Sequence, residues 1–322
     1  MELNLYPLQF TPILKDKIWG GTKLKTILNK EITSDTTGES WEISTVGEDV
    51  SMINNGAFLG KSLNEVIALY PDEILGTAVY MNFGKQFPLL FKFIDATQDL
   101  SIQVHPNDAL AKKRHNSFGK TEMWYIMQAD ENARLIVGFK QDSSAKEYVE
   151  HLDGKNLLDI LDEIPARKGD VYFLETGTIH AIGAGIVLAE IQQTSDITYR
   201  VYDWDRTDAD GNSRELHIAE ALDAINYNRI DTQKKYDAAV NQSNSVVNCP
   251  YFTTNFLPLN GKLHVDKKGN SFTVYMCVEG NFQLEYEGVA YAYQKGDTVL
   301  IPGAMRLFDL AGEASILEIY IS

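Results

Sequence analysis

The sequence predicts a mainly β protein made of two β-barrel domains, with a few helices inserted in and after the first. Glycine and other turn residues interrupt the chain at roughly every 10–15 residues, a spacing typical of sandwiches and barrels. The segments between them are short, alternating or apolar, and rich in Val, Ile, Tyr and Phe. A Lys-Gly-Asp turn followed by an apolar run occurs at 168–170 and again at 295–297. This internal similarity indicates two barrel repeats.

The apolar runs are expected to be strands, because their residues alternate or are continuously apolar over strand-like lengths. The clearest are Phe87–Ile94, Leu100–His105, 120–128, Asp170–Leu174, Ile186–Gln192, Phe272–Val278 and Thr298–Ile301. Helices are expected where the apolar period approaches 3.6, or where Ser or Asn stands at the first position as a cap. These are Ser62–Leu69, Asn107–Arg114, Ser144–Leu152, Leu157–Leu161 and Leu216–Asn226.

Length and charge limit the classes of function. A chain of 322 residues favours about two domains. The polar stretch Asp231–Val247 suggests a division into a metal-binding domain, 1–240, and a C-terminal β domain without a metal site, 241–322. A net charge of −16 argues against a nucleic-acid or anionic-membrane partner. Two cysteines without a C-x-x-C motif exclude a disulfide framework and favour the reducing cytoplasm. The oligomeric state stays open.

The two Lys-Gly-Asp repeats differ in one chemically important residue. In the first copy, the turn is followed by Glu175, Gly177 and His180. In the second copy, Leu307 stands where His180 would be. Only the first barrel is therefore predicted to hold a metal through this turn.

Four polar residues of the first barrel suit a metal site. Gln103 and His105 are two apart, and Pro106 ends their strand. Glu122 lies on the next strand, and His180 is expected at the end of a later one. Two imidazoles and a carboxylate suit Zn²⁺, with the Gln103 amide as a fourth ligand. The alternative is that each His and Glu is an ordinary structural or solvated residue.

A polar strand face follows these residues. Glu190, Gln192, Asp196 and Arg200 all occupy even positions, whereas the odd positions are mostly apolar. This face lines either a site inside the barrel or the solvent side of a sheet. Lys92 is the one charge in an apolar run, so it either has a buried partner or anion, or reaches solvent at the strand edge.

Several blocks make the chain resemble the type I phosphomannose (mannose-6-phosphate) isomerases, a zinc-dependent branch of the cupin superfamily. They follow the family's order over about residues 6–205. The blocks are Trp19-Gly-Gly, Gly38-Glu-Ser-Trp-Glu-Ile-Ser, Phe87-Pro-Leu-Leu-Phe-Lys-Phe-Ile-Asp, Leu100-Ser-Ile-Gln-Val-His-Pro-Asn-Asp, Gly119-Lys-Thr-Glu-Met-Trp, Gly177-Thr-Ile-His-Ala-Ile and Gln192-Gln-Thr-Ser-Asp-Ile-Thr-Tyr-Arg-Val-Tyr-Asp.

The resemblance implies two cupin-like (jelly-roll) barrels, one Zn²⁺ per chain and a sugar-phosphate substrate. The family's zinc ligands fall on His105, Glu122 and His180, and Gln103 matches a fourth ligand of longer relatives. The family's catalytic arginine falls on Arg200, and an active-site lysine on Lys120. The implied reaction interconverts D-mannose 6-phosphate and D-fructose 6-phosphate through an enediol(ate).

The roles of the other polar residues stay open at this stage. Glu190, Asp196 and Lys120 are candidates for the general base, and Arg200 either adds positive charge or orients the sugar. Lys92 and Asp196 are predicted to bind substrate. The net charge of −16 should repel a phosphate dianion, so a local cationic pocket is required. The rival hypotheses are an iron-dependent cupin dioxygenase, a sugar-phosphate sensor and a purely structural two-barrel protein.

Overall fold

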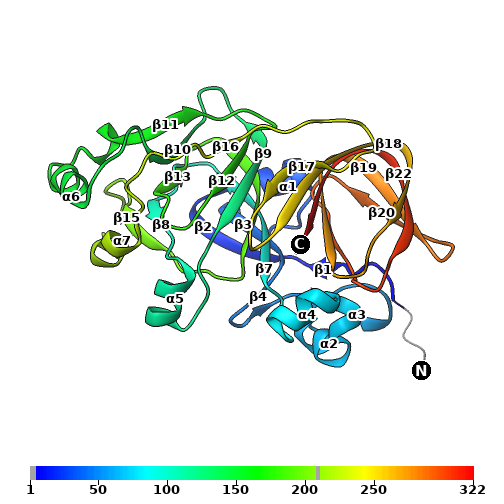
Figure 1. Ribbon diagram of the computed structural model, residues 1–322. Helices are drawn as coiled ribbons and strands as arrows, with labels where there is room; N and C mark the ends of the chain where they lie inside the picture. The colour runs from blue at the N-terminus through cyan, green and yellow to red at the C-terminus, as the bar shows by residue number, and fades with distance from the viewer. Residues whose placement is uncertain (1–4, 208–210) are drawn as a thin grey trace.

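Two β-barrels lie side by side in the computed structural model, which describes residues 5–207 and 211–322 (Figure 1). The first barrel consists of a seven-stranded and a five-stranded sheet. The seven-stranded sheet has the order β16 (Gln233–Lys234), β12 (Val171–Leu174), β9 (Glu122–Ala129), β14 (Ile186–Gln193), β7 (Leu89–Ala96), β3 (Thr37–Ile43) and β2 (Ile13–Gly21). The five-stranded sheet has the order β11 (Leu161–Pro165), β10 (Arg134–Phe139), β13 (His180–Ile182), β8 (Ile102–Val104) and β15 (Tyr199–Tyr202).

The second barrel is a six-stranded sheet of long antiparallel strands that curls on itself (Figure 1). Its order is β17 (Asn244–Asn248), β18 (Thr253–Asp266), β22 (Leu307–Tyr320), β19 (Thr273–Tyr286) and β20 (Val289–Gln294), and β21 (Thr298–Ile301) also pairs with β19. The remaining strands of the described residues form two small ribbons, β1 (Phe10–Thr11) with β6 (Met52–Ile53) and β4 (Thr45–Val46) with β5 (Asp49–Val50). The predicted mainly β class with two jelly-roll barrels is confirmed.

Seven short helices decorate the barrels within the described ranges 5–207 and 211–322. They are α1 (Lys23–Leu28), α2 (Leu63–Leu69), α3 (Pro71–Leu75), α4 (Thr77–Phe83), α5 (Asp108–His115), α6 (Ala145–Asp153) and α7 (Ile218–Ala224). Ser62, Asn107 and Ser144 cap α2, α5 and α6 with their side chains, as expected. The predicted helix Leu157–Leu161 is wrong. A single 3-10 turn, Leu157–Asp159, leads there into β11, because five residues carry too little periodicity to separate helix from strand.

The two Lys-Gly-Asp turns share one geometry. Gly169 and Gly296 have φ angles of 89° and 94°, a backbone conformation that residues other than glycine rarely adopt. Asp170 and Asp297 each accept the backbone N–H of the residue three positions earlier, at 2.9 and 2.8 Å. Each turn leads directly into a buried strand, β12 or β21.

The core of the first barrel lies between its two sheets. Trp124 and Leu188 of the seven-stranded sheet pack there with Leu135 and Ile182 of the five-stranded sheet. A larger apolar cluster covers the outer face of the seven-stranded sheet and contains residues of both barrels and of α1–α4. The two barrels therefore share a core instead of meeting at a polar surface.

Candidate active site

The period-2 geometry of the sheet places a set of polar side chains inside the first barrel. In β9, Met123 and Tyr125 belong to the outer apolar cluster, whereas Trp124 lies in the inner core. Glu122 and Trp124 are two residues apart in this strand, so the Glu122 side chain also points inward. The same alternation turns Glu190 of β14 and Lys92 of β7 toward the interior. All three are almost fully buried.

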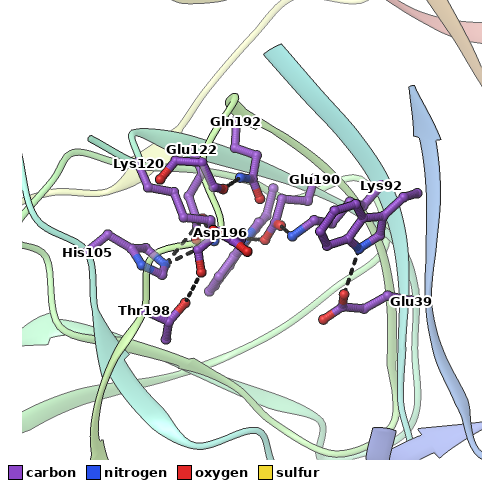
Figure 2. Close-up of polar contacts among 12 residues, drawn as sticks. Glu39, Lys92, His105, Lys120, Glu122, Glu190, Gln192, Asp196 and Thr198 are labelled. Atoms are coloured by element: carbon purple, nitrogen blue, oxygen red, sulfur yellow. Dashed lines mark hydrogen bonds and ion pairs between the residues drawn. The ribbon is translucent and has the colours of Figure 1, made fainter. Parts of the chain in front are cut away.

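Glu122 forms a compact group with His105 and His180. Figure 2 labels Glu122 and His105 of this group. The Nε2 atom of His105 lies 3.5 Å from Oε2 of Glu122, and Nε2 of His180 lies 3.4 Å from Oε1. The three ligand atoms all lie within 4.8 Å of one another, and all three residues are buried. His105 follows β8, Glu122 opens β9 and His180 opens β13, so the group spans both sheets.

Backbone carbonyls set the tautomer of both histidines. Nδ1 of His105 lies 2.8 Å from the carbonyl oxygen of Ile197, and Nδ1 of His180 lies 2.8 Å from that of Thr178. A carbonyl only accepts hydrogen bonds, so each Nδ1 carries the proton and each Nε2 presents a lone pair. Metal-binding imidazoles in proteins are commonly oriented in this way, with the ring nitrogen that does not face the metal donating to a backbone carbonyl.

The protonation states of the group also suit a cation. Burial lowers the pKa of His180 to about 4 and that of His105 well below its usual range, so both rings are neutral. Burial raises the pKa of Glu122 to about 7, although the Lys120 ammonium opposes this shift. Oε1 of Glu122 is buried and accepts no hydrogen bond among the described residues. A divalent cation would stabilise the carboxylate and bind this unpartnered oxygen.

Two more predicted residues adjoin the group. Nε2 of Gln103 lies 3.3 Å from Nε2 of His180, and rotating this amide by half a turn presents its oxygen instead. Nζ of Lys120 donates to Oε2 of Glu122 at 2.7 Å and to Nε2 of His105 at 3.1 Å. Lys120 lies in the turn before β9, not within the strand as predicted.

A second buried cluster lies beside the first (Figure 2). Nζ of Lys92 donates to Glu190 at 2.9 Å, and the indole of Trp124 donates to the other oxygen of Glu190 at 2.9 Å. Burial raises the pKa of Glu190, but Lys92 and Lys120 outweigh this effect and hold it at about 2. The ammonium of Lys92 also lies 5.1 Å from the ring centroid of Trp41, whose indole donates to Glu39 at 2.7 Å.

The alternatives left open for the polar residues are now decided. Lys92 is buried and paired, so an edge lysine that reaches solvent is the wrong interpretation. Glu190 and Gln192 lie inside the barrel, so the polar face of their strand is not its solvent side. His180 begins a strand instead of ending one.

Arg200 and Asp196 lie at the opening of the site. β14 ends at Gln193 and β15 begins at Tyr199, so the polar positions 190–200 do not form one continuous strand. Nη1 of Arg200 donates to the carbonyl of Glu215 at 2.7 Å, and its buried Nε has no partner among the described residues. Asp196 is exposed at the mouth of the same cavity.

A cavity of about 460 Å³ adjoins the His105–Glu122–His180 group, and Gln103 and Lys120, which contact that group, are part of its lining. Its charged lining residues are Lys15, Lys17, Lys92, Lys120, Arg200 and Arg214, opposed by Glu39, Asp49, Glu190 and Asp196. Six cations against four anions make the lining net positive in a chain whose net charge is −16. The cavity thus has the local positive charge that an anionic sugar phosphate requires.

Sequence reasoning missed several of these residues. Lys15, Lys17 and Arg214 stand in no quoted motif, and no signal in a single sequence points to them. Glu39 and Trp41 stand in the Gly38-Glu-Ser-Trp block, which was available as a signal but was not connected to the site. His217, which the sequence analysis did not single out, accepts the backbone N–H of Arg200 at 3.1 Å and so holds the main chain of that residue.

Comparisons with known proteins agree along the whole chain. The catalytic-domain model of type I phosphomannose isomerase matches residues 7–136, and the cupin-domain model of mannose-6-phosphate isomerase matches residues 242–321. The chain is 33% identical to a mannose-6-phosphate isomerase of Streptococcus mutans over 97% of both chains. It is 34% identical to a mannose-6-phosphate isomerase of Bacillus subtilis, over 97% of this chain and 98% of that protein.

A solved structure extends the likeness to three dimensions. The crystal structure of the mannose 6-phosphate isomerase from Bacillus subtilis superposes with a TM-score of 0.89 and 34% identity. The match covers 98% of this chain and 99% of that one. Taken with the buried His-Glu-His group and its cationic cavity, these matches show that the chain belongs to the type I phosphomannose isomerase family.

Proposed function

We propose that this protein is a zinc-dependent isomerase that interconverts D-mannose 6-phosphate and D-fructose 6-phosphate. The observation that carries the proposal is the convergence of two neutral imidazoles and one carboxylate beside a cavity with a net positive lining, to which Gln103 and Lys120 connect them. Relatives of nearly equal length carry this enzyme name. No helix within the described ranges is long and apolar enough to cross a membrane. The two free cysteines are consistent with action in the reducing cytoplasm.

His105, Glu122 and His180 would hold the zinc ion. Their donor set of two nitrogens and one oxygen is typical of catalytic zinc, which keeps a position open. Nε2 of His180 lies 3.4 Å from Oε1 of Glu122 and Nε2 of His105 lies 3.5 Å from Oε2, so all three residues would reach one cation. Gln103, 3.3 Å from His180, would add its amide oxygen after a half-turn of the amide. When bound, zinc supplies Lewis acidity that stabilises negative charge on a sugar oxygen.

The reaction requires a proton to move between C1 and C2 of the open-chain sugar through an enediol(ate). Of the three candidate bases, Glu190 is the weakest, because its ion pair with Lys92 holds its pKa at about 2. We assign Glu190 to positioning Lys92 and Trp124. Lys120 lies beside the ligand atoms, with its Nζ 2.7 Å from Oε2 of Glu122 and 3.1 Å from Nε2 of His105, and is the first candidate by position. Asp196 at the cavity mouth is the second candidate.

The cations of the cavity would bind the phosphate dianion and orient the sugar. Arg200 and Arg214 stand at the rim with planar guanidinium groups that suit a phosphate or a hydroxyl pair. The buried, unpartnered Nε of Arg200 is available for such a contact. Lys92, although tied to Glu190, adds positive charge to the inner wall.

The decisive experiment measures conversion of mannose 6-phosphate to fructose 6-phosphate by the purified protein, before and after a chelator, with Zn²⁺, Co²⁺ or Mn²⁺ added back. Activity should disappear with the chelator and return with Zn²⁺. The Glu122→Gln variant, which removes the charge of the carboxylate ligand, should lower kcat by roughly 100-fold or more. Ser62→Ala, at a helix cap outside the cavity, is the control and should keep full activity.

Three results would contradict the proposal. Sugar-phosphate binding without turnover in any metal state would point to a sensor. Oxygen uptake with added Fe²⁺ would point to a cupin dioxygenase. If the protein neither bound nor converted the sugar phosphate, its likeness to the family would be one of fold alone.

A further inference from the structure

A hydrogen-bond chain runs from the second barrel to the loop that carries Lys120. The hydroxyl of Tyr251, in the turn between β17 and β18, donates to Oδ2 of Asp108 at 2.6 Å. Oδ1 of Asp108 accepts the backbone N–H of Gly119 at 2.8 Å. The same Oδ1 accepts the side-chain amide of Gln193 at 3.1 Å.

Gln193 extends this chain to the other side of Lys120. Its Oε1 accepts the backbone N–H of Thr121 at 2.9 Å, and its own backbone N–H donates to the Thr121 carbonyl at 3.1 Å. The peptide groups on both sides of Lys120 are therefore held by side chains of one network. The backbone N–H of Lys120 donates to the Pro106 carbonyl at 3.3 Å, while its Nζ donates to Glu122 and His105.

Close packing of Gly119 leaves the loop around Lys120 little room to move. A Cβ atom on Gly119 would lie 2.7 Å from the Asp108 nitrogen and 3.0 Å from the Pro106 oxygen, distances that real Cβ atoms rarely reach. The glycine thus packs directly on the backbone at the start of α5. Asp108 is itself fixed there, because the side chain of Asn107 caps the helix by accepting the Leu110 N–H at 2.9 Å.

Tyr251 is equally well fixed on the second barrel. The Cys249 N–H donates to the Phe252 carbonyl at 3.0 Å across its turn, and Phe252 is fully buried in the shared core. Burial and the neighbouring Asp108 raise the pKa of the Tyr251 phenol to about 12, so it stays protonated and acts as a donor. Its partner is a carboxylate, so this bond is of the stronger, charge-assisted kind.

We propose that Tyr251 is a positioning residue for the isomerase site: through Asp108 it fixes the Gly119–Thr121 loop and hence the place of the Lys120 amine. The inference rests on the proposed function. It gives the second barrel, which has Leu307 in place of the histidine ligand, a part in the chemistry of the first.

The first test compares Tyr251→Phe with Tyr236→Phe in the zinc-loaded enzyme. Tyr236 also lies between the barrels, packs on Phe256 and donates its hydroxyl hydrogen bond to the Gly169 carbonyl at 2.7 Å. It lies far from the loop in sequence and belongs to a different hydrogen-bond network. Tyr251→Phe should lower kcat by roughly tenfold with KM nearly unchanged, because misplacing a reacting group slows the chemical step. Tyr236→Phe should change neither constant.

Two further measurements separate positioning from general loosening. In an Asp108→Ala background, Tyr251→Phe should cause no additional fall in kcat, because both act through the same chain. Amide hydrogen exchange of residues 119–121 should be faster in Tyr251→Phe than in Tyr236→Phe. An equal fall in kcat in both backgrounds, or unchanged exchange of the loop, would overturn the inference.

The outcomes also distinguish this inference from the proposed function. Wild-type protein without isomerase activity in any metal state would overturn the function itself. An active wild type whose kcat is unchanged by Tyr251→Phe would overturn only the role of Tyr251.

Discussion

Two lysines with buried ammonium groups show that the neighbours of a charge decide whether it stabilises or destabilises the folded state. Lys92 has Glu190 at 2.9 Å and a further attraction to Glu39, and these raise its pKa although burial lowers it. Nζ of Lys267, in the second barrel, is buried with no hydrogen-bond partner among the residues described and lies 5.6 Å from the ring centroid of Tyr275. Burial lowers its pKa to about 8. The first lysine belongs to a paired network, whereas the second is a burden on folding.

Replacing these lysines by methionine should therefore have opposite effects. Lys267→Met should raise the free energy of unfolding at pH 7 by roughly 2–3 kcal/mol, because the folded state no longer holds a charge that it disfavours. Between the folded pKa of about 8 and the ordinary 10.5, the unfolded chain binds more protons, so the stability of the wild type rises with pH and the gain shrinks. Lys92→Met should destabilise by about 3 kcal/mol or more, because it leaves Glu190 buried and unpaired.

Urea unfolding at pH 7 and pH 10 measures both effects. A Lys267→Met variant that is less stable than the wild type at pH 7 would mean that the contact with the Tyr275 ring outweighs the cost of burying the charge.

At the scale of elements, the sequence predicts what depends on local periodicity. That Glu190 and Gln192 share one face follows from strict alternation along one strand, although the sequence left open whether that face points inward or to solvent. The capped starts of α2, α5 and α6 follow from single residues. The pairing of Lys92 with Glu190 could not be predicted, because it depends on which strands become neighbours in the sheet. Lys120 was misplaced in a strand because two-residue spacing alone does not show where pairing begins.

The repeated Lys-Gly-Asp turn allows a matched test of what glycine does in an element. A Cβ atom on Gly169 would meet only the Tyr236 hydroxyl at 3.7 Å, whereas on Gly296 it would lie 2.5 Å from the Leu28 carbonyl oxygen. Gly169→Ala should lower the free energy of unfolding by about 1–2 kcal/mol, because alanine disfavours the left-handed backbone conformation but meets no clash there. Gly296→Ala should cost about 3 kcal/mol or more, because the backbone must also move. Equal costs, measured by urea unfolding, would show that the backbone near Leu28 yields freely.

At the scale of the whole molecule, the shared core links two units that the sequence separates near residue 240. Phe252 and Phe256 of the second barrel pack in one apolar cluster with Met123 and Tyr125 of the first. The ring centroids of Tyr125 and Phe256 lie 6.0 Å apart in a stacked arrangement. Tyr251, next to Phe252, carries the hydrogen-bond chain to the Lys120 loop. The same contact surface thus serves both folding and the site, and we expect the two units to unfold together.

The tryptophans make this cooperativity measurable. All four, Trp19, Trp41, Trp124 and Trp204, belong to the first barrel, so their fluorescence reports on that unit alone. Phe252→Ala removes a fully buried ring of the second barrel, at a cost of about 3–5 kcal/mol. Because the core is shared, the tryptophan-monitored midpoint in urea should fall and still coincide with the transition seen by far-UV circular dichroism. Val289→Ala, at a side chain half exposed on β20, should leave both midpoints unchanged. If Phe252→Ala instead split the two transitions and left the tryptophan midpoint in place, the barrels would be independent folding units, and the hydrogen bond from Tyr251 would join two separately stable bodies.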